Sequence, residues 1–202
     1  MKPHEFAGTI PGMGISRVAL LPQFAAPPAP RPVDAHNVTL RLATSADEPF
    51  LWEMLAEAAR LEENAGDIAA VRLRPDLALY VEGWGRGGDV GVVAEIDGCL
   101  VGAAWMRLFD DARHGYGYLR ADVGELAIAV VPDRRYCRVG TLLLHELIAH
   151  ARVRHHGVSL SVRRDNVVAR RLYDHFGFRE VAADIERNGG RALTMFLELH
   201  GV

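Results

Sequence analysis

The chain has 202 residues, of which 50% are hydrophobic and 24% are charged, a composition typical of a globular domain and not of a disordered chain. Its net charge of −3 gives no general electrostatic case for binding nucleic acid, and no apolar run approaches the roughly 20 residues that span a bilayer. Two cysteines, Cys99 and Cys137, cannot build a disulfide framework, so a reducing, cytoplasmic compartment is the expectation.

The first 36 residues differ in composition from the rest of the chain. Prolines crowd the span from Pro22 to Pro32, and glycines precede them. Proline lacks an amide donor and disfavours regular structure around it. We therefore expect residues 1–36 to be an N-terminal extension, either a tail or a strap, and residues 37–202 to form a single domain.

Regular patterns begin after Asn37. Residues 38–42 alternate like a strand, and the pair Ser45 and Glu48 has the spacing of a capping box in front of a helical pattern that starts at Phe50. Residues 60–88 are mixed in character and are expected to hold a short second helix. The stretch from Gly83 to Gly88 fits the letters GxGxxG, but a strand follows it, so we interpret it as a glycine-rich loop and not as a dinucleotide site.

The middle of the chain predicts a hairpin and a further strand. Two apolar runs, residues 90–96 and 100–109, are joined by Asp97-Gly98, a strong hairpin signal. Another strand is expected over residues 125–131, ended by Pro132. A helix is expected over about residues 140–155, and a strand over residues 158–162.

The C-terminal part predicts one more helix and two closing strands. Asn166 can cap that helix and Gly177 can end it, and strands are expected over residues 178–184 and 191–199. The order of elements is β, α, (α), β, β, β, α, β, α, β, β. It indicates a mixed α/β sheet with helical crossovers.

The segment from Glu125 to Thr141 carries the most chemistry. A strand, a polar loop with three arginines and a helix follow one another, so backbone amides and the positive end of the helix converge on one place. Arginine side chains there suit a phosphate group. The alternative, on local grounds alone, is a solvated basic turn.

A second segment runs from Asn166 to Phe178. Local physics identifies only a capped amphipathic helix with a glycine stop, in which Tyr173 is more readily a packed tyrosine than an acid. The two segments together resemble the GNAT superfamily of acetyl-CoA-dependent N-acetyltransferases, and the resemblance covers about residues 38–199. The loop is similar to the pyrophosphate loop Arg/Gln-x-x-Gly-x-Gly/Ala, here from Arg135 to Gly140. The later helix is similar to the family signature at Asn166, Ala169, Leu172, Tyr173, Gly177 and Phe178.

This resemblance implies a GNAT-like fold, acetyl-CoA as co-substrate and a role for each matching residue. The strand end, Ile128, Ala129 and Val130, would pair its backbone with the pantetheine arm. The amides of the loop would hold the pyrophosphate: Arg135, Tyr136, Cys137, Arg138, Val139, Gly140 and Thr141. Asn166 would lie near the cofactor, and Tyr173 would protonate the leaving thiolate, which suits a phenol with a pKa of about 10. One position departs from the family pattern, because Arg138 stands where the first loop glycine is usual, and its Cβ could obstruct a close approach to the pyrophosphate.

The general base is less clearly indicated. Glu125 opens the strand, and some relatives place a catalytic glutamate near this position, where it would act directly or through a water. The alternative is a strand-edge carboxylate that contacts an arginine. The acidic residues Glu57, Glu62, Glu63 and Asp67 either favour a cationic acceptor or form a solvated helix face.

No metal site is expected. His145 and His150 are five residues apart and do not stack as metal ligands at i and i+4 would, so the histidines of this helix are interpreted as a solvated face.

Three functions remain after these observations. The leading one is transfer of an acetyl group from acetyl-CoA to a primary amine by direct attack in a ternary complex. The others are a non-catalytic acyl-CoA-binding or sensor domain of the same fold, which the arginine at position 138 motivates, and transfer of a different acyl group. No nucleic-acid or membrane partner is expected, the acceptor amine is unidentified, and a homodimer is left open.

Overall fold

The computed structural model describes residues 37–59, 67–181 and 190–199. The expected tail or strap, residues 1–36, lies outside the described residues, as do Glu62 and Glu63. Within the described residues, helices and strands follow the predicted order, with two short helices between the first helix and the second strand.

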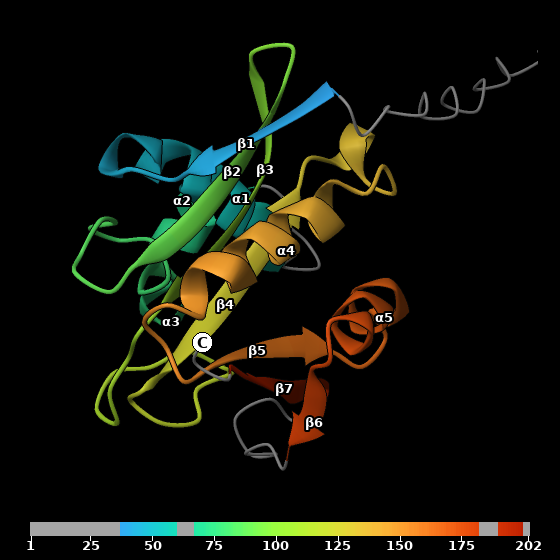
Figure 1. The fold of residues 1–202 in the computed structure, drawn as a ribbon. Coiled ribbons are helices and arrows are strands. Elements are labelled where there is room, and N and C mark those ends of the chain that lie inside the picture. The colour runs from blue at the N-terminus through green and yellow to red at the C-terminus, as the bar shows by residue number, and fades with distance from the viewer. Residues whose placement is uncertain (1–36, 60–66, 182–189, 200–202) are drawn as a thin grey trace, which may run out of the picture.

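One seven-stranded sheet organises the fold, in the order β1-β2-β3-β4-β5-β7-β6 (Figure 1). Neighbouring strands are antiparallel except β4 and β5, which run parallel. The strands are β1 (Val38–Leu42), β2 (Val90–Ile96), β3 (Cys99–Arg107), β4 (Val123–Val130), β5 (Gly157–Arg163), β6 (Arg179–Val181) and β7 (Ala192–Glu198). The mixed α/β sheet predicted from the sequence is confirmed.

Helices cover both faces of this sheet (Figure 1). One apolar core joins α1 (Glu48–Ala59), α2 (Ile68–Arg72) and α3 (Pro75–Ala78) to one face, where Trp105 of β3 is fully buried. The other core joins α4 (Val139–Ala151) and α5 (Val167–His175) to the opposite face, with Leu143 and Leu147 fully buried. Burial of such side chains contributes roughly 1.5–3 kcal/mol each before the entropy of ordering is subtracted.

The predicted hairpin is confirmed at Asp97-Gly98. Both residues have positive φ, 52° and 76°, as a two-residue turn between β2 and β3 requires. The predicted capping box is displaced by one residue: Thr44 and Asp47 form it, in front of a short 3-10 helix, Ser45–Asp47. Glu48 instead accepts a hydrogen bond from the Trp52 indole within α1 (3.3 Å) and one from the Trp84 amide (3.2 Å), and the latter joins α1 to the turn before β2.

Helix α4 is shorter than expected. It ends at Ala151, where the sequence analysis placed the end near residue 155. The turn that follows returns the chain to the sheet, and it buries His155, which is 7% exposed, so the interpretation of a solvated histidine face is wrong at this residue. Burial lowers the pKa of His155 below 6.5.

The parallel pair β4 and β5 creates the feature that positions the site. Their register stops after three residue pairs, the last of which is Glu125 with Ser159. Beyond it, β4 continues to pair with β3 as far as Val130, and β5 continues to pair with β7 as far as Arg163. The sheet therefore splits, and a gap opens between the C-terminal ends of two neighbouring strands.

Candidate active site

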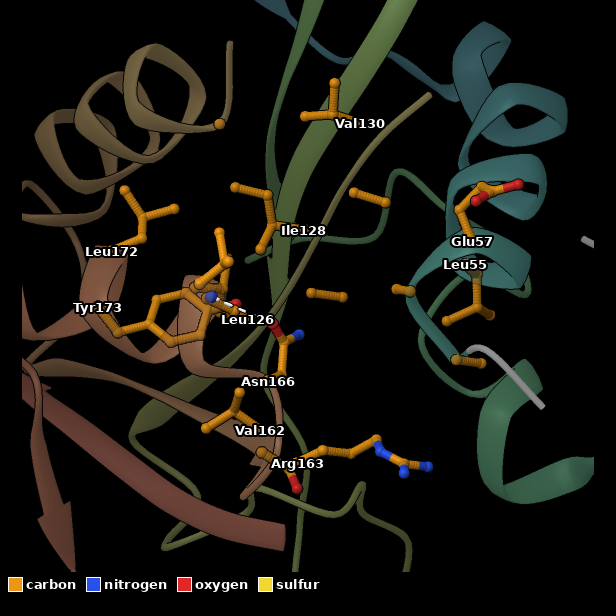
Figure 2. Close-up of a pocket in the computed structure, with 18 of the residues that line it drawn as sticks. Leu55, Glu57, Leu126, Ile128, Val130, Val162, Arg163, Asn166, Leu172 and Tyr173 are labelled. Atoms are coloured by element: carbon orange, nitrogen blue, oxygen red, sulfur yellow. Dashed lines mark hydrogen bonds between the residues drawn. The ribbon is translucent and has the colours of Figure 1, made fainter. Parts of the chain in front are cut away.

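A pocket of about 710 Å³ occupies this gap. β4 lines it along Leu126, Ile128 and Val130, and β5 lines it at Val162. Figure 2 shows Leu172 and Tyr173 of α5 on one side of the pocket and Leu55 and Glu57 of α1 on the other. The pocket thus crosses the sheet through its gap, with a helix from each layer beside it.

The backbone of β4 turns polar groups towards this pocket beyond its last pair with β5, and one of them, the Val130 carbonyl, accepts a hydrogen bond from the Arg135 guanidinium at 3.1 Å. The Val131 amide donates to the Val101 carbonyl of β3 at 2.9 Å, and backbone polar groups alternate along a strand. The polar groups of Ile128 and Val130 therefore face the gap, whereas those of Ala129 face β3. Of the three residues expected to pair with pantetheine, Ile128 and Val130 have the required orientation.

The loop after β4 follows the predicted strand–loop–helix plan. A 3-10 turn, Pro132–Arg134, leads through Arg138 into α4. The amides at the start of α4, from Val139 to Thr141, have no acceptor within the helix and lie at its positive end. The Arg135 amide, in contrast, already donates to the Pro132 carbonyl at 3.4 Å. An anion at this site would therefore meet the amides nearer the helix.

The three arginines of the loop have different roles. The Arg135 guanidinium turns back from the loop, donating to Glu57 (2.5 Å) and to the Val130 carbonyl (3.1 Å). It thereby ties α1 to the end of β4 and neutralises Glu57, a member of the acidic set noted in the sequence. Arg134 and Arg138 line the pocket, and Arg138 is exposed. These two carry the positive charge available to a phosphate.

Arg138 adopts a left-handed backbone with φ 63° and ψ 0°. Tyr136, which is 82% exposed, also has a positive φ of 64°. A left-handed backbone costs an L-residue roughly 1–2 kcal/mol, and glycine avoids that cost. This geometry explains physically why a glycine suits position 138, and it identifies the substitution as a strained one.

The second predicted segment brings Asn166 and Tyr173 to the pocket. Asn166 caps α5, its Oδ1 accepting from the Ala169 amide at 3.2 Å, as the sequence predicted. Tyr173 is 7% exposed, packs against Phe178 with ring centroids 5.6 Å apart, and lines the pocket opposite α1 (Figure 2). Burial raises the pKa of Tyr173 above 10, so its hydroxyl is protonated at neutral pH.

Glu125 is almost fully buried, with 1% exposure, and it does not line the pocket. Its Oε1 accepts hydrogen bonds from the Tyr80 hydroxyl and from the Gly117 amide, the latter at 2.6 Å. Arg107, which lies opposite Glu125 in the β3–β4 register, pairs instead with Asp89 at 2.7 Å. Tyr80, a pocket residue, is therefore the link between Glu125 and the cavity.

The wall of the pocket near α3 consists of residues that sequence reasoning missed. Tyr116 donates to Asp76, and Arg74 bonds to both Asp76 (Nε to Oδ1, 3.2 Å) and the Tyr116 hydroxyl (3.0 Å). Burial alone would raise the pKa of Asp76, but these hydrogen bonds outweigh it, and the pKa lies below 3.8. Tyr80 and Tyr116 come from stretches with no regular period, so no sequence signal marked them.

Two other expectations concern metals and membranes. Among the described residues, no group of three or more histidine, cysteine or acidic side chains is placed to hold a metal ion. In the same part of the chain, no helix is long and apolar enough to cross a membrane.

Comparison with known proteins identifies the family to which the chain is similar. The sequence model of the acetyltransferase (GNAT) family matches residues 50–178. No curated protein matches the sequence. A ribosomal-protein-alanine N-acetyltransferase from Brucella melitensis shares the fold with a TM-score of 0.56 and 25% identity, over 80% of this chain and 99% of that one.

Two further solved structures contain the co-substrate that the gap suggests. The Salmonella typhimurium protein YncA, solved with its cofactor acetyl-CoA, has a TM-score of 0.54 and 22% identity, over 82% of this chain and 96% of that one. A phosphinothricin acetyltransferase from Sinorhizobium meliloti, in complex with acetyl-CoA, has a TM-score of 0.57 and 19% identity, over 82% and 91%. At these identities, the two structures establish the fold.

Proposed function

Because the chain belongs to the GNAT family of acetyltransferases, whose co-substrate is acetyl-CoA, we propose that it transfers the acetyl group to a primary amine by direct attack in a ternary complex. The observation that carries the proposal is the gap between β4 and β5. It combines a strand edge that is not paired with β5, a basic helix start and a protonated tyrosine in one cavity. Acetyl-CoA has a pantetheine arm, a pyrophosphate and a thioester, which suit the strand edge, the helix start and the tyrosine respectively.

The donor would be held by three parts of the chain. The backbone groups of Ile128 and the amide of Val130 would bind the pantetheine arm as an added strand does, while the Val130 carbonyl is bonded to the Arg135 guanidinium. The amides from Val139 to Thr141 and the guanidinium groups of Arg134 and Arg138 suit the pyrophosphate. Asn166 lies where α5 begins beside the same cavity. This placement brings the thioester towards the Tyr173 side of the gap.

Tyr173 would act as the general acid. The Tyr173 residue is 7% exposed, and its hydroxyl makes no hydrogen bond to another described residue, so it can donate to a thiolate without breaking a bond within this part of the chain. Its raised pKa keeps the proton in place until sulfur develops negative charge. Glu125 is the proposed base for the acceptor amine, and because it does not line the pocket it would act through another group.

Acetyl-CoA with a panel of amines tests this function: spermidine, alanine, a peptide with an N-terminal alanine, a lysine peptide and an aminoglycoside. Release of CoA thiol is followed for each. Amine-dependent thiol release by the unmodified protein supports an acetyltransferase. Tight binding of acetyl-CoA without release for any amine would favour the sensor function that Arg138 motivates.

A further inference from the structure

We propose that Tyr80 is a further catalytic residue, which takes the proton from the acceptor amine while passing its own proton to Glu125. The inference rests on the proposed function and identifies the residue that would touch the amine. It arises because the buried carboxylate at the base of the gap does not reach the cavity, whereas the tyrosine bonded to it does.

Tyr80 reaches Glu125 from a different part of the fold. It lies in the turn after α3, and its hydroxyl donates to Oε1 of Glu125 on β4. Both side chains are nearly inaccessible, at 6% and 1% exposure. Two donors, the Tyr80 hydroxyl and the Gly117 amide, converge on Oε1, an arrangement that an ionised carboxylate satisfies.

The hydrogen bonds of the Tyr80 hydroxyl leave one position open. Its proton points to Glu125, and one of its lone pairs accepts from the Tyr116 amide at 2.9 Å. A hydroxyl oxygen has two lone pairs, so these bonds leave one of them unassigned on a residue that lines the pocket, and the proposal gives it to the acceptor amine. An ammonium group has N–H bonds to donate, and it is the form in which a primary amine reaches the site at neutral pH.

Close packing fixes this hydroxyl in place. A Cβ on Gly115 would lie 2.4 Å from the Tyr80 ring carbon Cζ and 2.6 Å from Oε2 of Glu125, so only glycine permits the loop to lie there. The Trp105 indole donates to the Tyr80 carbonyl at 3.1 Å. Arg107 donates to the Leu79 carbonyl at 2.9 Å and pairs with the buried Asp89. These two hydrogen bonds from β3 therefore hold the backbone at Leu79 and Tyr80 against the sheet.

The electrostatics favour a coupled transfer of two protons. Burial, followed by the negative charge of Glu125, raises the pKa of Tyr80 well above 10. A free phenolate at position 80 is therefore unfavourable, and Tyr80 can accept a proton only as it gives up its own. The titratable and charged groups facing this hydroxyl are Glu125 from β4 and Tyr116 from the preceding loop, with Asp76 and Arg74 bonded to Tyr116.

The proposed step balances. The ammonium proton of the acceptor moves to the Tyr80 oxygen, and the Tyr80 proton moves to Oε1 of Glu125. The nitrogen lone pair then forms the C–N bond, the C–S bond breaks, and Tyr173 gives its proton to the sulfur. The second proton that the nitrogen loses restores Tyr173 by way of water, and Glu125 releases its proton to solvent as the product leaves. One acetyl group is transferred, and one proton enters solvent.

Tyr80→Phe, Glu125→Gln and the double variant test the relay in the full-length protein, with Tyr118→Phe as a matched control. Tyr118 lies in the same loop region, donates to Asp111 at 2.7 Å and does not line the pocket. Phenylalanine keeps the edge-to-face contact of Tyr80 with Phe109, and glutamine still accepts from Tyr80 but cannot take its proton. The probes are acetyl-CoA and the panel amine that the unmodified protein acetylates fastest, from pH 6 to 10. Thermal melting and calorimetric acetyl-CoA binding accompany the kinetics.

We expect Tyr80→Phe to lower kcat by about 10²–10⁴-fold at pH 7, with acetyl-CoA affinity within twofold of the unmodified protein. The defect shrinks as the pH passes the pKa of the amine, because a deprotonated amine needs no base. The double variant is about as slow as either single variant, since both interrupt one path. A Tyr80→Phe rate within threefold of Tyr118→Phe, or a defect independent of pH, overturns the relay. If the relay is overturned in this way but Tyr173→Phe still slows the reaction, the proposed acetyltransferase function stands without the relay. If the unmodified protein shows no turnover with any amine of the panel, both the relay and the proposed function are overturned.

Discussion

Replacing Arg138 by glycine and by alanine separates the two consequences of having arginine at this position. The residue has φ 63°, where any Cβ is unfavourable, and its guanidinium lies at the pocket beside the start of α4. Both variants remove the charge, but only glycine removes the Cβ. At a positive φ, alanine is less stable than glycine by about 1 kcal/mol or more. For a domain of this size, that difference corresponds to a Tm shift of roughly 2–4 °C.

Differential scanning calorimetry of the two variants measures the backbone strain at position 138. Titration with acetyl-CoA at low and at high salt measures how much the Arg138 charge contributes to binding. We expect Arg138→Gly to melt above Arg138→Ala by those few degrees. We also expect both variants to bind acetyl-CoA more weakly than the unmodified protein at low salt, and the difference to narrow as salt screens the phosphate contact. Equal melting temperatures for the two variants would refute the strained backbone, and unchanged affinity in both would refute the phosphate role of Arg138.

Three further predictions follow from buried groups. Tyr173→Phe keeps the packing and removes the proton, so turnover should fall about 10²–10⁴-fold with little change in acetyl-CoA affinity by calorimetry. Asp89→Asn leaves the Arg107 guanidinium buried without its counter-charge, and the free energy of unfolding in urea should fall by about 3–5 kcal/mol. The hydrogen bond from Arg41 holds the pKa of Asp47 at about 2 rather than 3.8. This lowered pKa stabilises the folded state by about 1–2 kcal/mol, a value reduced because Arg41 is partly exposed. The stabilisation is present above pH 4 and is lost as the pH falls through 2. Urea unfolding of Asp47→Asn and of the unmodified protein across that range measures it.

Each of these predictions has an outcome that contradicts it. An unaltered rate in Tyr173→Phe would reduce that residue to a packing role. The control for Asp89→Asn is Asp122→Asn, whose ion pair with Arg120 is solvent-exposed and should contribute little to stability, so an equal loss in the two variants would contradict the role of the buried Asp89–Arg107 pair. A difference in the free energy of unfolding between Asp47→Asn and the unmodified protein that stays constant from pH 6 down to pH 2 would contradict the link between the Asp47 pKa and stability.

The sequence predicted the elements whose signals are local. The local signals are the apolar run of residues 90–96, the turn at Asp97-Gly98 and the cap at Asn166. Each depends on neighbours in the chain, and each feature is found where expected. The shift of the capping box to Thr44 and Asp47 is the kind of error that local patterns permit, because Arg41 on β1 selects Asp47 through two hydrogen bonds.

The acceptor side of the pocket depends on contacts between distant segments. Tyr80 and Glu125 are 45 residues apart, and Glu57 and Arg135 are 78 apart. Neither pair has a spacing that marks it, since each forms only when α1 and α3 pack against β4. The donor side could be predicted because its strand, loop and helix start are consecutive in the chain.

The central claim is that the edge of β4 facing the gap holds the acetyl donor. Amide hydrogen exchange measured by NMR, with and without acetyl-CoA, tests it at single residues. The Ile128 amide faces the gap and should exchange markedly more slowly when acetyl-CoA is bound, whereas the Ala129 amide is already bonded towards β3 and should change little. Saturating acetyl-CoA that leaves Ile128 exchange unchanged would contradict the account.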